Sequence, residues 1–309
     1  MAIKNGTHLD GYLISDCLST SGGMSAVYLA EKMDTKRKVA IKVAITDSNP
    51  NAAAHEDVLL QREAELLKRS DLRHPGIIRL YPVPLKHRKP LYVVRASSLQ
   101  ERPWYMSMEY LSGGSLKDSL KKISKYPLEW RLEFFYQILL PISFLHSKGY
   151  GHRDIKPDNI MFRTPLSDSG IPSPVFIDFA LTTNGQEYSP IVMDSYTPGY
   201  ASPERIINAM TTIGNRNDSG EDVKASDIWS LGVILYEILT GKVLYKGNKE
   251  KVKTTIIREK INPKLPIAGE RGANLGRIIQ SMLRKDPKRR PSIDLVITAL
   301  EQKFLPPHL

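Results

Sequence analysis

Cysteine is almost absent from this chain. Among its 309 residues Cys17 is the single cysteine, so no internal disulfide can form. A lone cysteine is most simply interpreted as a small buried apolar residue, and its lack of a partner fits a reducing environment.

Long apolar runs are also missing. The first residues, MAIKNGTHLDGYL, contain no apolar core of a signal peptide. The stretch from Ile228 to Leu239 is interrupted by Ser230, Gly232 and Glu237, and it is too short to cross a bilayer. We therefore expect a soluble, cytoplasmic protein without a membrane partner.

Acidic residues are outnumbered by basic ones, which gives a net charge of +11. Such a charge would suit a polyanionic partner. The basic clusters are not interleaved with aromatic residues that could stack bases, so nucleic-acid binding is not predicted, whereas a preference for acidic substrates stays open. These clusters comprise Lys117, Lys121, Lys122 and Lys125, then Lys246, Lys249, Lys251 and Lys253, and finally Arg284, Lys285, Lys288, Arg289 and Arg290.

Two nucleotide-binding motifs are absent as well. The chain has no GxxxxGK[ST] run, and no βαβ unit follows a GxGxxG, which excludes Walker-type and Rossmann-type sites. Its apolar and charged fractions, 41% and 25%, are those of an ordinary globular protein. Because the length exceeds that of most single domains, two lobes with substantial cores are expected.

What is present is a concentrated set of reactive side chains in the loop 152–159, HRDIKPDN. Asp154 could accept the proton of an attacking hydroxyl, and Lys156 could neutralise charge on a transferred phosphoryl group. Asn159 could hold a metal ion through its amide oxygen. A short charged loop is usually only a solvated connection, so the interpretation depends on what precedes and follows it.

The order of motifs along the chain decides the interpretation. A glycine-rich turn, a strand lysine, a helical glutamate, the loop 152–159 and an Asp-Phe pair follow one another. This set resembles that of the eukaryotic-like (Hanks-type) protein kinases, with Lys156-Pro157 typical of the serine/threonine branch. The turn sequence GGMSAVYLA is closest in style to bacterial members.

The first part of the chain resembles the N-lobe of these kinases. Strands are expected over 12–18, 26–31, 37–44 and 104–110, and a helix over 58–70. The motif Val39-Ala40-Ile41-Lys42 implies a phosphate-gripping Lys42 that needs an acidic partner, for which Glu63 fits the family pattern better than Glu65. The resemblance implies a nucleotide site made by Leu18, Gly22, Gly23, Met24, Ser25, Val27, Ala40, Lys42, Met108, Glu109, Leu111 and Met161. Met108 would be the gatekeeper, and the backbone groups of Glu109 and Leu111 would meet adenine.

The remainder resembles the C-lobe. Helices are expected over 115–124 and 128–148, the latter capped by Gly149, and a strand over 160–162. The resemblance implies that Asp178 and Asn159 bind magnesium and that Thr197 contacts the catalytic lysine and aspartate. It also implies an ion pair between Glu204 and Arg290, and an Asp227 that braces the catalytic loop.

Several positions depart from the family pattern. Thr20 and Ser25 replace two glycines of the turn, and Ala180 replaces the glycine after Asp-Phe. Two segments, 164–174 and 211–221, are interpreted as inserts, the first an exposed loop. In the activation segment Ser195, Thr182 and Thr183 are candidate phosphorylation sites that could pair with Arg153, with Asp194 as an alternative permanent anion.

Together these features predict an α+β, bilobal fold and one kinase domain over 1–309, with an N-lobe (11–108), a hinge (109–114) and a C-lobe (115–305). The predicted activity is transfer of the γ-phosphoryl group of ATP, with Mg²⁺ or Mn²⁺, to serine or threonine of protein substrates, accompanied by activation-loop autophosphorylation. The catalytic set is Asp154, Lys156, Lys42, Glu63 and Thr197. The alternatives are a pseudokinase scaffold without turnover and a small-molecule kinase. The sequence identifies neither the substrate, the upstream signal nor the oligomeric state.

Overall fold

The computed structural model describes residues 3–20, 25–44, 50–85, 89–167, 170–185, 196–210, 220–259 and 262–305, without the side chains of 50–54 and 220–222. The chain divides into two compact units, Met1–Ser112 and Gly113–Leu309. One is an antiparallel sheet with a helix and the other is mainly helical, which confirms the predicted bilobal α+β fold.

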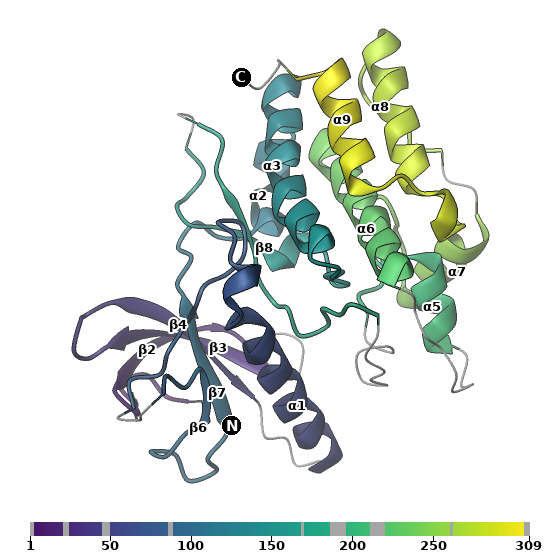
Figure 1. Ribbon diagram of the computed structural model, residues 1–309. Coiled ribbons are helices and arrows are strands. Elements are labelled where there is room, and N and C mark those ends of the chain that lie inside the picture. Colours follow the sequence, from purple (N-terminus) through teal and green to yellow (C-terminus); the bar gives the residue numbers. More distant parts are fainter. Residues whose placement is uncertain are drawn as a thin grey trace. The chain divides into compact units, whose positions relative to one another are not determined.

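The first unit is built on one curled sheet (Figure 1). Its strands run in the order β1-β2-β3-β4-β7-β5, with β6 also paired to β7, and every pair is antiparallel. Alternation of buried and half-buried residues along β3 explains why one face covers the core. The strands are β1 His8–Leu9, β2 Tyr12–Ser19, β3 Ser25–Lys32, β4 Lys38–Ala44, β5 Leu80–Tyr81, β6 Val93–Arg95 and β7 Trp104–Glu109.

The helix α1 (Pro50–Leu67) packs on this sheet, against β4 and β7. It begins eight residues before the expected start at Val58, so the predicted boundary is wrong. A proline at the first position is compatible with a helix because its missing N–H is not needed there. At the other end, the chain leaves α1 before a 3₁₀ turn, η1 (Ser70–Leu72).

Helices form most of the second unit. In Figure 1, α9 lies beside α3 and α8 beside α6. The helix α6 carries the buried Trp229, Leu231 and Leu235 and is the centre of this core. The helices are α2 Leu116–Ile123, α3 Leu128–Ser147, α5 Pro203–Met210, α6 Gly220–Thr240, α7 Lys249–Arg258, α8 Gly269–Met282 and α9 Ile293–Lys303, with 3₁₀ turns η2 Pro157–Asn159 and η3 Pro287–Arg289. A two-stranded sheet pairs β8 Ile160–Phe162 with β9 Pro174–Phe176.

The end of α3 delivers the chain to the loop 152–159. Gly149 has φ +85°, the left-handed value of a helix C-cap, as predicted. At Gly151 a Cβ atom would lie 2.8 Å from the carbonyl oxygen of Val223, so only glycine allows this close approach to α6. Local chain geometry therefore fixes where the loop begins.

Other expectations were wrong or are not covered. Cys17 is exposed rather than buried. Pro174 belongs to β9 and is buried, so the exposed insert ends before it. Residues 21–24 of the glycine-rich turn and 211–219 of the second insert lie outside the described residues.

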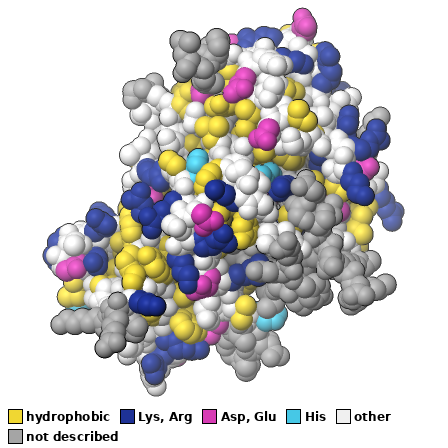
Figure 2. All heavy atoms as spheres, in the orientation of Figure 1, with side chains coloured by type: hydrophobic (Ala, Val, Ile, Leu, Met, Phe, Trp, Pro, Cys, Tyr) yellow, Lys and Arg dark blue, Asp and Glu magenta, His cyan; other side chains and the backbone are white. Residues whose placement is uncertain are grey.

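On the face drawn in Figure 2, Lys and Arg side chains occur in several separate groups. In the described part of the chain, no helix combines the length and apolar character needed to cross a membrane.

Candidate active site

Lys42 and Glu63 form an ion pair inside the first unit. Lys42 lies on β4 and Glu63 on α1, and their Nζ and Oε2 atoms are 2.6 Å apart. Glu63 is 0% exposed and Lys42 is 9% exposed, so the charges are largely removed from water. Glu65, the alternative partner, is exposed and pairs with Lys68 instead. The predicted partner of Lys42 is thus present.

The other predicted nucleotide contacts of this unit lie on neighbouring strands. Val27 is paired with Lys42, and Ala40 with Met108. The N–H of Glu109 donates to the Arg79 carbonyl (2.8 Å), so an adenine could only use the carbonyl of Glu109. The remaining predicted positions are Leu18 on β2, Ser25 on β3 and the buried Leu111, whereas Gly22, Gly23 and Met24 lie outside the described residues. Met161, from the second unit, lies on β8.

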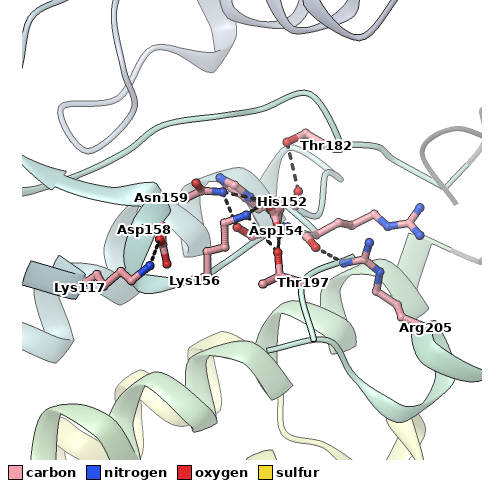
Figure 3. Close-up of polar contacts among 10 residues, drawn as sticks. Lys117, His152, Asp154, Lys156, Asp158, Asn159, Thr182, Thr197 and Arg205 are labelled. Atoms are coloured by element: carbon pink, nitrogen blue, oxygen red, sulfur yellow. Dashed lines mark hydrogen bonds and ion pairs between the residues drawn. The ribbon is translucent and has the colours of Figure 1, made fainter. Parts of the chain in front are cut away.

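Three side chains converge on Asp154 in the second unit (Figure 3). Lys156 Nζ and Asn159 Nδ2 donate to Oδ2 over 2.7 Å and 2.9 Å. The hydroxyl of Thr197 donates to Oδ1 (3.0 Å) and accepts from Lys156 (3.0 Å). Asp154 is thereby fixed by contacts from both the loop and the segment that precedes α5.

The backbone of this loop is held by one buried carboxylate, Asp227 on α6. Its oxygens accept from the amides of His152 (2.7 Å) and Arg153 (2.8 Å), as predicted. Burial alone would raise the pKa of Asp227, but a hydrogen bond from His146 (2.9 Å), electrostatic interaction with the imidazoles of His146 and His152, and the hydrogen bond from the Arg153 amide hold it below its usual value. The carboxylate therefore stays ionised and keeps accepting from the loop amides.

The imidazole of His152 points into the core below the loop. Its ring lies 4.7 Å from that of Phe179 and 5.4 Å from that of Phe176, between ring centroids. Burial lowers the pKa of His152, which keeps the ring neutral in this apolar setting. The packing positions the loop and gives His152 no direct chemical task.

Asn159 and Asp178 provide oxygen atoms suited to a hard cation. The amide nitrogen of Asn159 is used on Asp154, which leaves its oxygen available. Ile177 N–H donates to the Asn159 carbonyl (2.9 Å), so the adjacent Asp178 is brought next to Asn159. Among the described residues, no group of three or more His, Cys, Asp or Glu could hold a metal. The pair suits Mg²⁺, which needs few protein ligands and takes the rest from phosphates and water.

Backbone strain lies beside both site aspartates. Arg153 has φ +68° and Asp178 has φ +64°, values that non-glycine residues seldom adopt. Ala180, where the family has glycine, is not among the described residues with positive φ. The position therefore accommodates alanine without left-handed strain.

The activation segment corrects two predicted phosphorylation sites. Thr182 and Thr183 are 3% and 2% exposed. Thr182 donates to the His152 carbonyl, and the backbone of Thr183 exchanges two hydrogen bonds with Gly151. Neither hydroxyl is accessible, because this strand-like pairing fastens the segment to the loop. Ser195 and Asp194 lie outside the described residues.

Further contacts support the site from α5, α6 and η3. Arg290 makes two 2.7 Å bonds to Glu204, the predicted pair. Sequence reasoning missed that Arg205 donates to the Arg153 carbonyl and that the Tyr200 hydroxyl donates to Glu237 on α6. The two residues of each pair are far apart in the sequence, and no sequence motif predicts that they interact.

Comparisons with known proteins agree with this geometry. Residues 20–305 match the family described as protein kinase domain. Calcium/calmodulin-dependent protein kinase type 1B of Homo sapiens is 29% identical over 271 residues, covering 87% of this chain and 69% of the relative. Serine/threonine-protein kinase AtPK1/AtPK6 of Arabidopsis thaliana is 30% identical over 274 residues, covering 87% and 50%. PknD, a serine/threonine-protein kinase of Chlamydia felis, is 29% identical over 295 residues, covering 87% and 28%. The chain therefore belongs to the protein kinase family, in its Hanks-type serine/threonine branch.

Proposed function

We propose that this protein transfers the γ-phosphoryl group of ATP, with Mg²⁺, to serine or threonine hydroxyls of other proteins, and that residues 1–309 act as one kinase domain. The observation that carries the proposal is the hydrogen-bonded cluster around Asp154. Family membership supports nucleotide use, because protein kinases generally take ATP and Mg²⁺.

Asp154 is the proposed proton acceptor. A carboxylate has about four lone-pair sites. Two donors occupy Oδ2 and one donor, Thr197, occupies Oδ1. One site therefore remains on Oδ1, where a substrate hydroxyl could donate a hydrogen bond and then its proton as the oxygen attacks phosphorus.

Lys156 is the proposed partner of the transferred group. Its ammonium has three donors, of which one goes to Asp154 and one to Thr197. The third is available for an oxygen of the phosphoryl group, where positive charge stabilises the transition state. Thr197 holds the lysine and the aspartate in one geometry.

Lys42 and the pair Asn159–Asp178 are proposed to hold the nucleotide. Lys42, oriented by Glu63, would bind α- and β-phosphate oxygens. The oxygens of Asn159 and Asp178 would hold Mg²⁺, or Mn²⁺ in its place. When bound, the cation neutralises phosphate charge and orients the transferred group.

Label transfer tests the proposal. The pure protein is incubated with labelled ATP, Mg²⁺ and a generic basic protein, and phosphoamino acids are identified. Label on serine or threonine is expected. No label with any divalent metal, despite nucleotide binding, would favour the pseudokinase, and label only on small molecules would favour a small-molecule kinase.

The role of Asp154 is tested by Asp154→Asn, with Asp158→Asn as a matched control in the same loop. The Asp158 side chain is 42% exposed and pairs with Lys117 at 2.6 Å rather than with Asp154. Losing a positioned base lowers the rate by roughly 10²- to 10⁴-fold. The control should stay within a few-fold of the parent. A rate for Asp154→Asn equal to that of the control would remove Asp154 from the mechanism.

A further inference from the structure

A row of lysines follows α2, the helix beside the catalytic loop. Lys117 and Lys121 are one helical turn apart, so they lie on the same face of α2, about 6 Å from each other along its axis. Lys125 follows one turn later, where Ser124 keeps a helical backbone and the Lys125 amide donates to the Lys122 carbonyl (3.1 Å). All three residues are exposed. We call Lys117, Lys121 and Lys125 the lysine stripe.

The lysine stripe begins at the proposed active site. Lys117 Nζ donates to Asp158 (2.6 Å), and Asp158 precedes Asn159, whose amide donates to Asp154. Figure 3 shows Lys117 and Asp158 at the edge of the cluster around Asp154. The Lys117 side chain is 63% exposed. One of its three ammonium donors is used on Asp158, so two remain for another acceptor.

Positive charge prevails along the stripe. Within the part of the chain that the structure describes, no carboxylate pairs with Lys121 or Lys125. Two carboxylates lie near Lys117. Asp158 is its ion-pair partner, and Asp118 accepts from the hydroxyl of the helix N-cap residue (2.6 Å). The far end of the stripe therefore presents two uncompensated ammonium groups to solvent.

Stability of the helix does not explain this arrangement. Like charges four residues apart on a helix repel each other. A cation in the first turn, such as Lys117, also opposes the helix dipole, and only Lys121, in the last turn, is favoured by it. Because the stripe gives α2 little stability, binding of an anionic partner is the better explanation of its charges.

We propose that the lysine stripe binds an acidic segment of the protein substrate, with Asp or Glu at every second position. In an extended peptide every second side chain lies on the same side, roughly 7 Å from the next. This spacing is close to the ~6 Å between successive lysines, so three carboxylates can meet three ammonium groups at once. The inference names a substrate class for the proposed kinase and in this respect rests on the proposed function.

Fluorescence anisotropy of the full chain with labelled peptides measures this binding without turnover. Each peptide contains one serine and three alternating aspartates, placed before the serine in one peptide and after it in the other. Matched peptides carry asparagine in place of aspartate. An exposed ion pair changes the affinity by up to about fivefold. With three such pairs, one aspartate peptide should bind about tenfold or more tightly than its asparagine counterpart.

Substitutions at the far end of the stripe locate the site. Lys121→Gln combined with Lys125→Gln should weaken binding of that aspartate peptide by roughly four- to twentyfold and leave the asparagine peptide unaltered. Lys121→Glu should instead bind a peptide with lysine at the same positions more tightly than the parent does. Melting curves of all variants check folding, which changes at these exposed positions should not disturb.

Lys288→Gln is the matched control, because it makes the same charge change at a distant place. Lys288 is exposed and lies with Ala225 near the start of α6. Ser124, at the end of α2, lies against Gly241, just beyond the end of α6. The 21 residues of α6 separate these two places by about 30 Å. The control should therefore bind the aspartate peptide as the parent does.

The proposal fails if aspartate and asparagine peptides bind equally, or if Lys288→Gln loses as much affinity as the double variant. It also fails if the double variant loses as much affinity for a labelled polyuridine RNA, since this would indicate only attraction of polyanions. Kinase assays with the same peptides separate it from the proposed function. The double variant should raise KM for the aspartate peptide and leave kcat unchanged. Selective binding without label transfer would overturn the kinase but keep the stripe, whereas equal kcat/KM for all peptides would overturn the stripe alone.

Discussion

Replacing Glu237 by glutamine should stabilise the protein at alkaline pH and reduce the pH dependence of its stability. Glu237 is 1% exposed within α6. It accepts from the Tyr200 hydroxyl at 3.0 Å and 3.3 Å, and glutamine could keep one of these bonds. Burial raises the pKa of Glu237 to about 7, against the lowering effect of hydrogen bonds from Tyr200 and the Leu244 amide, and with a small raising effect of Asp158.

The magnitude follows from linkage between protonation and folding. The pKa rises from its ordinary 4.5 to about 7. At about 1.4 kcal/mol per tenfold change in acidity, this difference corresponds to roughly 3 kcal/mol. The folded state holds the proton more tightly than the unfolded state, so this stability is fully present below about pH 4.5 and is lost as pH rises through about 7. The glutamine side chain does not ionise, so the variant does not lose this stability as the pH rises.

Urea unfolding of parent and variant between about pH 5 and about pH 8 measures the effect. The free energy of unfolding of Glu237→Gln, relative to the parent, should increase with pH by up to roughly 3 kcal/mol. Glu301→Gln is the control, because Glu301 also accepts from a tyrosine, Tyr136 (3.0 Å), but is only half-buried. A pH-independent difference for Glu237→Gln, or the same trend in the control, would refute the reasoning.

Three further outcomes are expected. Lys42→Met removes the cation beside the buried Glu63 and should lower the stability by a few kcal/mol and abolish activity. The double variant with Glu63→Gln should regain the stability but not the activity. Recovered activity in the double variant would show that the lysine is only structural. Ala180→Gly should lower stability by roughly 0.5–1 kcal/mol through backbone entropy and keep activity within a few-fold; complete inactivation would show that alanine is required. If phosphorylation of Ser195 activates the enzyme, phosphatase treatment should remove the phosphate, as mass spectrometry can check, and lower the kinase activity. Ser195→Ala should lower the activity in the same way. Full activity after dephosphorylation would favour Asp194 as a permanent anion.

Much of the fold was accessible from the sequence because local patterns dictate it. Alternating apolar residues predict strands such as β3, and Gly149 marks the end of α3 through its left-handed backbone. The sequence does not predict the start of α1, because residues 50–57 carry little apolar periodicity.

The candidate site likewise contains contacts that local sequence patterns predict and contacts that they do not. The contacts of Asp154, Lys156 and Asn159 come from one short loop, so a motif is sufficient to predict them. The sequence does not predict the burial of Thr182, because this burial depends on a contact with His152, which lies 30 residues earlier in the chain. The pair Tyr200–Glu237 depends on the packing of two segments and has no local signal.

The carboxylate of Asp227 has a consequence for motion. Residues 152–156 have no regular secondary structure, yet the amides of His152 and Arg153 donate to an acceptor that is 0% exposed. Amide hydrogens exchange with solvent only when their bond opens and water reaches them. Opening here requires α6 and the loop to part, so these two amides should exchange as slowly as those in the centre of the helix. A loop of this kind behaves as part of the slowest-opening core.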